Sequence, residues 1–292
     1  MAQDIKTADI AIIGTGPAGI SAAITAKIRN KEIFLFGAEP VSSKVAKAHR
    51  ILNYPGLPAV SGEELAQAYK RHLDELQIAV TKKRVHAVYA MGSHFAIQAG
   101  DEQYRADSVI LACGMTADKP FPGENEFLGR GVSYCATCDA QFFKGKTVAV
   151  IGYTKESVEE AQYLAEIVGK VLYFPMGKEA VLPGLSGNIE ICTEKPAEIT
   201  GTMKVEQLKT DGKPVDGIFI LREAVFPGQL VPGLKTEKNH AAVNLQMETN
   251  VAGLFACGDI AGTPYQYIKA AGQGNVAALS AVSYLNRKKE TV

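Results

Sequence analysis

Two blocks of the chain share one order of hydrophobic and polar positions: an apolar run, a turn, a stretch with helical periodicity and a second apolar run. Short apolar runs are typical of buried strands, and apolar positions at helical spacing are typical of amphipathic helices. The first block comprises residues 8–13, 20–29 and 32–36, and the second comprises residues 147–151, 157–168 and 170–174. Each block therefore predicts a βαβ unit of the nucleotide-binding type.

The pattern in the rest of the chain predicts that one domain is inserted in the other. Further elements are expected as a helix at 62–76, strands at 85–90, 94–98 and 108–112, a linker at 116–125, a strand from 251 that ends in a Gly-Asp turn, and a helix at 273–285. The last strand and helix follow the second block and can complete the first domain. The expected fold is α/β, with two Rossmann-like nucleotide-binding domains of three-layer ββα type.

Composition narrows the classes of function. Lys and Arg number 31, as do Asp and Glu, so the formal net charge is zero and neither nucleic acid nor an anionic membrane is expected as a partner. No apolar run reaches the roughly 18 residues that a membrane span needs, and the first residues lack a signal-peptide layout. Five cysteines, an odd and sparse number, argue against a secreted disulfide scaffold. We expect a cytoplasmic protein without a metal site.

The turn of the first block carries a dinucleotide fingerprint. It reads Gly14-Thr15-Gly16-Pro17-Ala18-Gly19, between the predicted strand and helix. Glycines allow a tight turn and a close approach of the backbone to a pyrophosphate, and the helix offers free N–H groups and its positive dipole end to that anion. Glu39 follows the next strand, where a carboxylate suits a ribose hydroxyl. A fortuitous glycine-rich turn is the alternative, but the strand–turn–helix context favours a dinucleotide.

Between the two blocks, a cysteine pair predicts redox chemistry. Cys135 and Cys138 are separated by two residues, and Asp139 follows directly. Two thiols at this spacing can close a small disulfide, and the arrangement lowers the pKa of the attacking thiol. Asp139 can pass a proton to or from a thiolate. The other cysteines, Cys113, Cys192 and Cys257, are expected to be small buried hydrophobes.

Together these motifs resemble the low-molecular-weight thioredoxin reductases, a family of two-domain flavoproteins, from residue 8 to about residue 285. The features that carry the resemblance are the Gly14–Gly19 turn, Asn53-x-Pro55-Gly56, Cys113-Gly114, residues 129–139, Gly258-Asp259, Gln266 and residues 271–274. The resemblance implies an FAD domain formed by residues 1–115 and 246–292, and a redox domain of residues 116–245. It also implies a homodimer that reduces thioredoxin.

The same resemblance assigns the site residues. It implies FAD contacts from Gly14, Gly16, Pro17, Ala18, Gly19, Glu39, Asn53, Gly114, Gly258, Asp259 and Gln266. It implies a redox disulfide between Cys135 and Cys138, with Cys138 facing the flavin and Cys135 attacking thioredoxin. Asp139 matches the family's acid that protonates a thiolate.

Three departures from the family affect the expected cofactor contacts. The second block's turn has Thr154 where the NADPH enzymes have a glycine, and its side chain would obstruct a pyrophosphate. Residues 174–178 contain no arginine where those enzymes grip the 2′-phosphate, and losing two arginines weakens binding ~10²–10⁴-fold. In the FAD domain, residues 41–44 replace the family's Gly-Gly-Gln stretch.

An intact disulfide segment beside an altered nucleotide turn leaves the electron donor open. We favour a ferredoxin-dependent flavin thioredoxin reductase, a branch of the family that keeps the cysteine pair and lacks the NADPH motifs. A plant-type ferredoxin near about −400 mV can reduce thioredoxin near about −270 mV through FAD. The alternatives are an NAD(P)H-dependent thioredoxin reductase with an altered site and a dithiol oxidase that passes electrons through FAD to O₂. A flavin-binding module without enzymatic activity would not need the cysteine pair and its aspartate.

Overall fold

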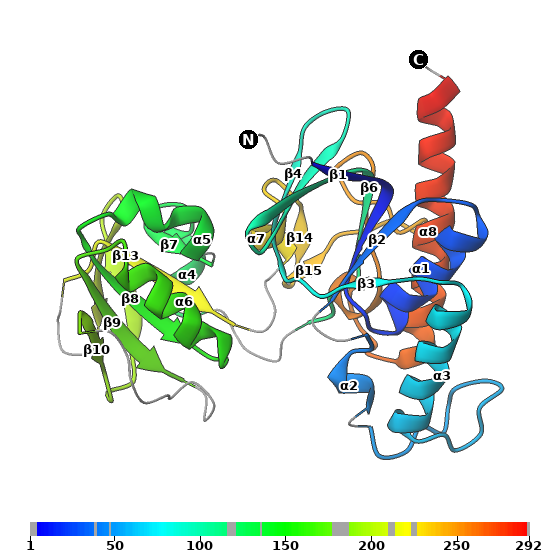
Figure 1. Ribbon diagram of the computed structural model, residues 1–292, viewed down its shortest axis with the longest axis horizontal. Coiled ribbons are helices and arrows are strands. Elements are labelled where there is room, and N and C mark those ends of the chain that lie inside the picture. The colour runs from blue at the N-terminus through cyan, green and yellow to red at the C-terminus, as the bar shows by residue number, and fades with distance from the viewer. Residues whose placement is uncertain are drawn as a thin grey trace. The chain divides into compact units, whose positions relative to one another are not determined.

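The computed structural model divides the chain into two compact units (Figure 1): Met1–Met115 with Phe226–Val292, and Thr116–Val225. It describes residues 5–37, 40–46, 48–115, 121–134, 136–176, 187–209, 214–222 and 227–290, without the side chains of Asn125, Thr137 and Cys138. The second unit is thus inserted in the first, as the sequence predicts.

In the first unit, β1 (Lys6–Ile13) lies inside a mixed sheet with the strand order β3-β2-β1-β6-β5-β4, and β16 pairs with β6 outside that order. The other strands are β2 (Ile33–Phe36), β3 (Val80–Thr81), β4 (Val85–Ala90), β5 (Phe95–Ala99), β6 (Glu102–Leu111) and β16 (Leu254–Ala256). The pairs around β1 are parallel, as is β16 with β6, whereas β4, β5 and β6 pair antiparallel. The carboxyl ends of β1, β6 and β16 therefore meet at one edge, which is where parallel sheets bind ligands.

Two helices, α1 (Pro17–Ile28) and α8 (Tyr267–Glu290), share one hydrophobic core with this sheet. Small residues let the two helices approach closely, because a Cβ on Gly274 would lie 2.0 Å from the carbonyl oxygen of Ala18. This close packing compensates for glycine's low helix propensity. It explains why α8 begins before the predicted residue 273 and runs through Gly272 and Gly274.

The first unit also contains short elements on either side of the insertion. These are α2 (Ser43–Ala46), α3 (Gly62–Glu75), α7 (Pro227–Leu230), the hairpin of β14 (Thr236–Glu237) and β15 (His240–Ala241), and the 3₁₀ helix η2 (Gly258–Ala261). Because α7 contacts β4 and β15 contacts η2, this part of the chain belongs to the first unit. The chain therefore returns to the first unit at 225/226, earlier than the expected 245/246, while the outward crossing lies at the expected 115/116.

The second unit is built in three layers around a parallel sheet. The strand order is β10-β9-β8-β13-β7, from β7 (Val132–Ser133), β8 (Thr147–Gly152), β9 (Lys170–Pro175), β10 (Ile189–Ile191) and β13 (Gly217–Leu221). The helix α6 (Glu156–Ala165) packs on one face through Val158, Ala161 and Leu164. On the other face lies the antiparallel pair β11 (Glu198–Gly201) and β12 (Val205–Lys209). The expected ββα layering is present, and the region after residue 189 that looks poor in helix consists largely of strands.

Three short helical segments complete the second unit: α4 (Glu124–Phe127), α5 (Ala136–Asp139) and the 3₁₀ helix η1 (Ala140–Phe143). The helix α4 begins inside the linker that the sequence predicts at 116–125. Gly123 precedes it with a φ of 83°, and a Cβ there would lie 2.3 Å from the carbonyl oxygen of Ile199. A glycine is therefore needed at this entry to the second unit.

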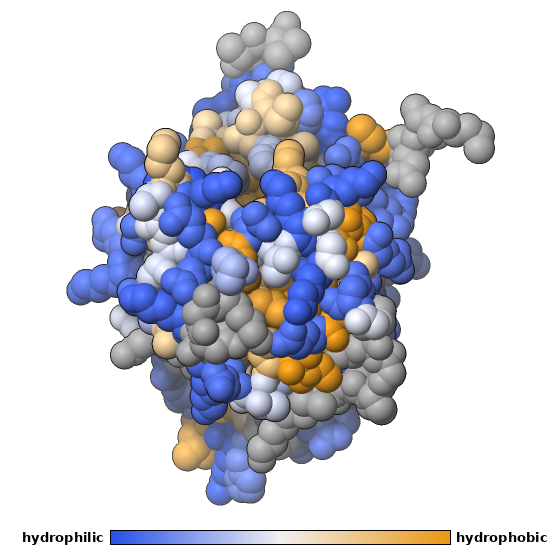
Figure 2. All heavy atoms as spheres, turned by 90° about the vertical axis from the view of Figure 1, so that its left-hand side faces the viewer, coloured by the Kyte–Doolittle hydropathy of each residue, from blue (hydrophilic) through white to orange (hydrophobic). Residues whose placement is uncertain are grey.

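Hydropathy over one face of the molecule is shown in Figure 2, where hydrophilic side chains predominate and apolar ones lie between them. Among the residues that the structure describes, no helix combines the length and the apolar composition that crossing a bilayer requires.

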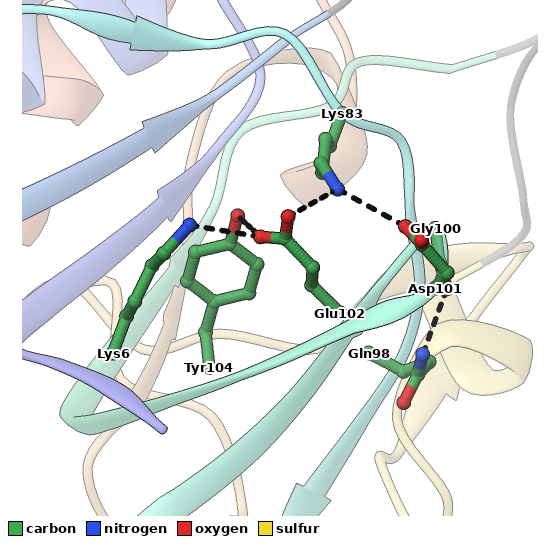
Figure 3. Close-up of polar contacts among 7 residues, drawn as sticks. All are labelled: Lys6, Lys83, Gln98, Gly100, Asp101, Glu102 and Tyr104. Carbon is green, nitrogen blue, oxygen red and sulfur yellow. Dashed lines mark hydrogen bonds and ion pairs between the residues drawn. The ribbon is translucent and has the colours of Figure 1, made fainter. Parts of the chain in front are cut away.

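A polar network links the starts of β1 and β6 to the segment between β3 and β4 (Figure 3). The carboxylate of Glu102 lies between two lysines, 3.0 Å from Lys6 Nζ and 2.8 Å from Lys83 Nζ, and accepts a 2.5 Å hydrogen bond from Tyr104 Oη. Lys83 also contacts Asp101 at 3.1 Å. The bonds from Lys83, Tyr104 and Lys6 lower the pKa of Glu102 to about 2.

Replacing Glu102 with Gln should change how stability depends on pH. A carboxyl group whose pKa falls from 4.5 to about 2 on folding stabilises the protein above pH 4.5, and this contribution is lost as the pH falls towards 2. Glu102→Gln should therefore lower stability at pH 7 and flatten its decline below pH 4.5, measured by urea titration with hydrogen exchange of the β5 and β6 amides. Asp74→Asn, which breaks the exposed Lys70–Asp74 pair within one helix, is the control and should change both little. If the stability of Glu102→Gln declined below pH 4.5 as steeply as that of the wild type, the stabilising role of the Glu102 carboxylate would be contradicted.

Candidate functional site

The first glycine turn fits a dinucleotide. Gly14 follows β1 with a φ of 119°, and a Cβ there would lie 2.3 Å from the carbonyl oxygen of Ala112. A Cβ on Gly19 would lie 1.8 Å from the carbonyl oxygen of Gly14, whereas one on Gly16 would meet no described atom within 4 Å. Gly14 and Gly19 are thus required by the fold, and Gly16 faces open space. Because α1 starts at Pro17 with no side-chain cap and no acidic residue in its first turn, its N–H groups can bind an anion.

Asn53 and Gln266 come together although they are far apart in the sequence. The Asn53 side-chain amide donates to Gln266 Oε1 at 2.7 Å. Gly114, beyond the end of β6, has a φ of 69°, and a Cβ there would meet no described atom within 4 Å. Two side chains and a backbone turn that the sequence assigns to the cofactor therefore belong to the same unit as the glycine turn. Glu39 lies outside the described residues.

The turn that carries Asp259 is held by side chains that sequence reasoning did not identify. Gly258 N–H donates to Gln273 Oε1 at 3.0 Å, and Lys269 Nζ donates to the carbonyl oxygens of Gly258 at 2.9 Å and Gly262 at 2.5 Å. Burial raises the pKa of the half-buried Asp259 carboxyl, and the charges of Lys269, Lys44 and His240 oppose that rise. Basic side chains from three segments thus act on the carboxylate at this edge of the sheet.

Two of these basic side chains have defined partners. Lys44, from the stretch that replaces the family's Gly-Gly-Gln, donates to the Met115 carbonyl oxygen at 2.7 Å. His240 Nε2 lies 2.7 Å from Tyr265 Oη. The sequence pointed to Lys44, because residues 41–44 differ from the Gly-Gly-Gln stretch of the family. The contact of His240 with Tyr265 could not be predicted in this way, because it depends on the folding of β15 against η2.

In the second unit, the redox segment crosses from β7 into α5. Ser133 Oγ donates to Asp139 Oδ2 at 2.6 Å, so a side chain on the strand before the cysteine pair fixes the carboxylate after it. Ala136 and Ala140 are buried in the core under α6. Cys135 lies outside the described residues, and the backbone of Cys138 is in α5 while its side chain is not described. The structure therefore supports Asp139 as an oriented carboxylate.

A buried ion pair anchors the same segment. Glu124 is fully buried, and its two carboxylate oxygens accept bonds from Arg222 Nη1 at 2.6 Å and Nη2 at 2.8 Å. Tyr134 Oη donates to Glu124 at 3.0 Å, and Phe121 N–H donates to it at 2.5 Å. The guanidinium lies 5.0 Å from the ring centroid of Tyr153, in the second glycine turn. Glu124 therefore connects the entry of the unit, the residue before the cysteine pair and the end of β13.

The second glycine turn is filled by the protein's own side chains. A Cβ on Gly152 would lie 2.4 Å from Ser157 Oγ and 2.5 Å from Tyr173 Oη, and these two hydroxyl oxygens are 2.8 Å apart. Ser157 Oγ also donates to the Thr154 carbonyl oxygen at 2.5 Å. Thr154 is buried, and the obstruction of a pyrophosphate by its side chain stays a prediction. Glu156 and Glu159 occupy the first turn of α6, where they disfavour an anion.

The remaining thiols show no sign of redox activity. Cys257 is buried, as predicted, whereas Cys113 and Cys192 are only partly buried. Burial raises the pKa of Cys113 to about 11 and that of Cys257 further. Protonated thiols are poor nucleophiles, so chemistry is expected at the other pair. Within the described part of the chain, no group of three or more His, Cys, Asp or Glu side chains could hold a metal ion.

Comparisons with known proteins agree with this geometry. A family profile described as pyridine nucleotide-disulphide oxidoreductase matches residues 8–274. Two crystal structures of a ferredoxin-flavin thioredoxin reductase from Clostridium acetobutylicum are similar. One is 50% identical, with a TM-score of 0.82 over 98% of this chain and 100% of that chain, and the other is 47% identical, with a TM-score of 0.89 over 97% and 99%. A thioredoxin reductase of Aquifex aeolicus is 34% identical over 100% of this chain and 98% of its own length.

Loss of one partner of the Glu124–Arg222 pair should destabilise the second unit strongly. Glu124→Gln leaves a buried guanidinium without its counter-charge, which costs about 3–5 kcal/mol. Hydrogen exchange of the β8 and β13 amides in increasing urea reports on this unit. The matched control is Glu124→Met combined with Arg222→Met, which removes both charges and should recover most of the loss. A double variant less stable than Glu124→Gln would contradict the role of the ion pair.

Proposed function

Because the chain belongs to the pyridine nucleotide-disulphide oxidoreductase family, and its fold is that of thioredoxin reductases, we propose that it reduces thioredoxin with electrons from ferredoxin. The observation that carries the choice of donor is the second glycine turn, where the buried Thr154 stands in the position of Gly16 and two glutamates occupy the first turn of α6. The likeness to two ferredoxin-flavin thioredoxin reductase structures at 47–50% identity supports the same donor.

The first unit is the FAD domain of this proposal. Its glycine turn, with Gly14, Gly16, Pro17, Ala18 and Gly19, would receive the pyrophosphate at the start of α1. Asp259 and Gly258 would hold the ribityl and phosphate region, and Asn53, Gly114 and Gln266 would line the flavin. Glu39 keeps its expected role towards the ribose. Bound FAD supplies the conversion between single electrons and the electron pair that a disulfide requires.

The second unit is the redox domain. Cys135 and Cys138 would form the disulfide that is reduced, and the resulting dithiol would reduce thioredoxin. Asp139, held by Ser133 Oγ at 2.6 Å, would give a proton to the departing thiolate and take it back in the next cycle. We further propose a homodimer and a cytoplasmic location, which suits the three free cysteines outside the redox pair.

Physical chemistry disfavours a pyridine nucleotide as donor. A pyrophosphate needs close access to backbone N–H groups, but Thr154 stands where the first turn has Gly16, and Glu156 and Glu159 at the start of α6 disfavour an anion. The nearby arginine at the end of β13, Arg222, is bound to Glu124 through both terminal nitrogens and is not available for a phosphate. Lys178 lies outside the described residues. The expected weak binding of NADPH therefore depends on the second glycine turn and on the engagement of Arg222 by Glu124.

The donor can be identified by anaerobic stopped-flow spectroscopy of the FAD-loaded protein. Reduced ferredoxin should bleach the flavin absorbance, whereas NADPH and NADH at micromolar concentration should leave it unchanged. Added oxidised thioredoxin should then restore the flavin absorbance in the wild type and fail to do so in Cys135→Ser. Rapid bleaching by NADPH would overturn the proposal. Oxygen consumption driven by a small dithiol, with no response to ferredoxin, would identify a dithiol oxidase instead.

Lys269 should stabilise bound FAD by fixing the turn that carries Asp259. Its ammonium group joins the carbonyl oxygens of Gly258 and Gly262, and Lys269→Met removes both bonds. Two lost charge-assisted bonds should raise the dissociation constant of FAD by about 10- to 100-fold. Titration of the apoprotein by quenching of FAD fluorescence measures this change. Lys289→Met, at the exposed end of α8, is the control, and equal affinities of the two variants would remove Lys269 from the site.

A further inference from the structure

The first unit contains two stretches with positive charge and no Asp or Glu, residues 41–61 and 76–100, and hydrogen bonds link the first of them to the proposed flavin site. Residues 41–61, named the basic segment here, contain Lys44, Lys47, His49 and Arg50 and no Asp or Glu. The whole chain has a formal net charge of zero, so the basic segment departs from its surroundings. Lys44, His49 and Arg50 are exposed, and the described residues include no ion-pair partner for His49 or Arg50. Lys47 lies outside the described residues.

The basic segment has a fixed shape, which lets it present these charges. Val45 and Ile51 are buried beside Leu65 of α3. Ile51 N–H donates to the Val60 carbonyl oxygen at 2.8 Å, and Gly62 N–H donates to that of Ala48 at 2.8 Å. The side chain after Ile51 points the other way, since Leu52 is 70% exposed. A docking partner would therefore meet a rigid surface with basic groups and one apolar side chain.

Hydrogen bonds connect the basic segment directly to the proposed flavin site. Lys44 Nζ donates to the Met115 carbonyl oxygen, Tyr267 Oη donates to that of Lys44 at 3.2 Å, and the Asn53 amide donates to Gln266 at 2.7 Å. An electron carrier must bring its cluster close to the flavin before single electrons can pass. A partner bound to Arg50 and Leu52 would be next to Asn53, which is the place where such a carrier has to dock.

We propose that the basic segment is the docking surface for an acidic iron–sulfur electron carrier, with Arg50 as the steering charge and Leu52 as the apolar contact. The inference rests on the proposed function, because it requires a protein donor of single electrons. Opposite charges raise the rate of encounter about 10- to 10³-fold and make it sensitive to salt. Electrons pass from the reduced cluster to the flavin, and no bond forms between the two proteins.

The test measures reduction of the flavin by a reduced acidic ferredoxin in FAD-loaded Arg50→Glu. At low ionic strength the second-order rate constant should fall about 10- to 100-fold, and its dependence on salt should weaken. Arg50→Lys should retain most of the rate, because steering needs only the charge. Arg105→Glu makes the same change of net charge on an exposed residue in the first half of β6, away from the carboxyl end of the strand; it is the matched control and should behave like the wild type. Photochemical reduction of the flavin should be equal in all variants.

Each alternative gives a different result. If ferredoxin fails to reduce the wild-type flavin, the proposed function falls and the docking surface falls with it. If ferredoxin reduces wild type and Arg50→Glu equally fast, only the docking surface is overturned. A raised dissociation constant of FAD in Arg50→Glu would assign the segment to the cofactor. Conversion of a dimer to a monomer, seen by light scattering, would assign the segment to a subunit interface.

Discussion

A carboxylate that is fully removed from water is tolerated only where an opposite charge and several hydrogen-bond donors meet it. Glu124 satisfies this condition with Arg222, Tyr134 and the backbone of Phe121. The entry of the second unit, the strand before the cysteine pair and the end of β13 can reach Glu124 only if all three are folded. The Glu124–Arg222 pair can therefore form only when the whole second unit is folded. It explains why the segment before the cysteines has a defined position.

The glycine turns of the two units differ in whether they leave room for the phosphates of a nucleotide. In the first unit, the backbone packs so closely around Gly14 and Gly19 that neither position has room for a side chain. Gly16 and the start of α1 face open space and can receive an anion. In the second unit, Thr154 takes the position of Gly16 and is buried, and Ser157 and Tyr173 pack against Gly152, the counterpart of Gly14. The same βαβ geometry therefore supports a cofactor site in one half of the chain and a closed structural turn in the other.

Local patterns were sufficient for the βαβ units and the first glycine turn, because each is encoded within a short stretch, whereas the redox role of Cys135 and Cys138 stays a prediction. The sequence did not reveal α4, since a proline- and glycine-rich stretch hides a buried glutamate whose partner Arg222 is 98 residues away. It also did not reveal the surroundings of Asp259, where Lys44, His240 and Lys269 come from separate segments. The strands after residue 189 were obscured by their short length. Contacts of this kind depend on the tertiary fold rather than on spacing along the chain.

The hydrogen bond between Ser157 and Tyr173 has an evolutionary consequence. Removing the serine hydroxyl would leave the buried tyrosine hydroxyl without that partner, and removing the tyrosine hydroxyl would do the same to the serine. These two hydroxyls therefore hold the second turn in place, and a nucleotide site would need a glycine at position 154 and new cationic groups for a phosphate as well. Under the proposed function, a lineage with this turn depends on its protein electron donor, and its thiol metabolism follows the supply of that donor.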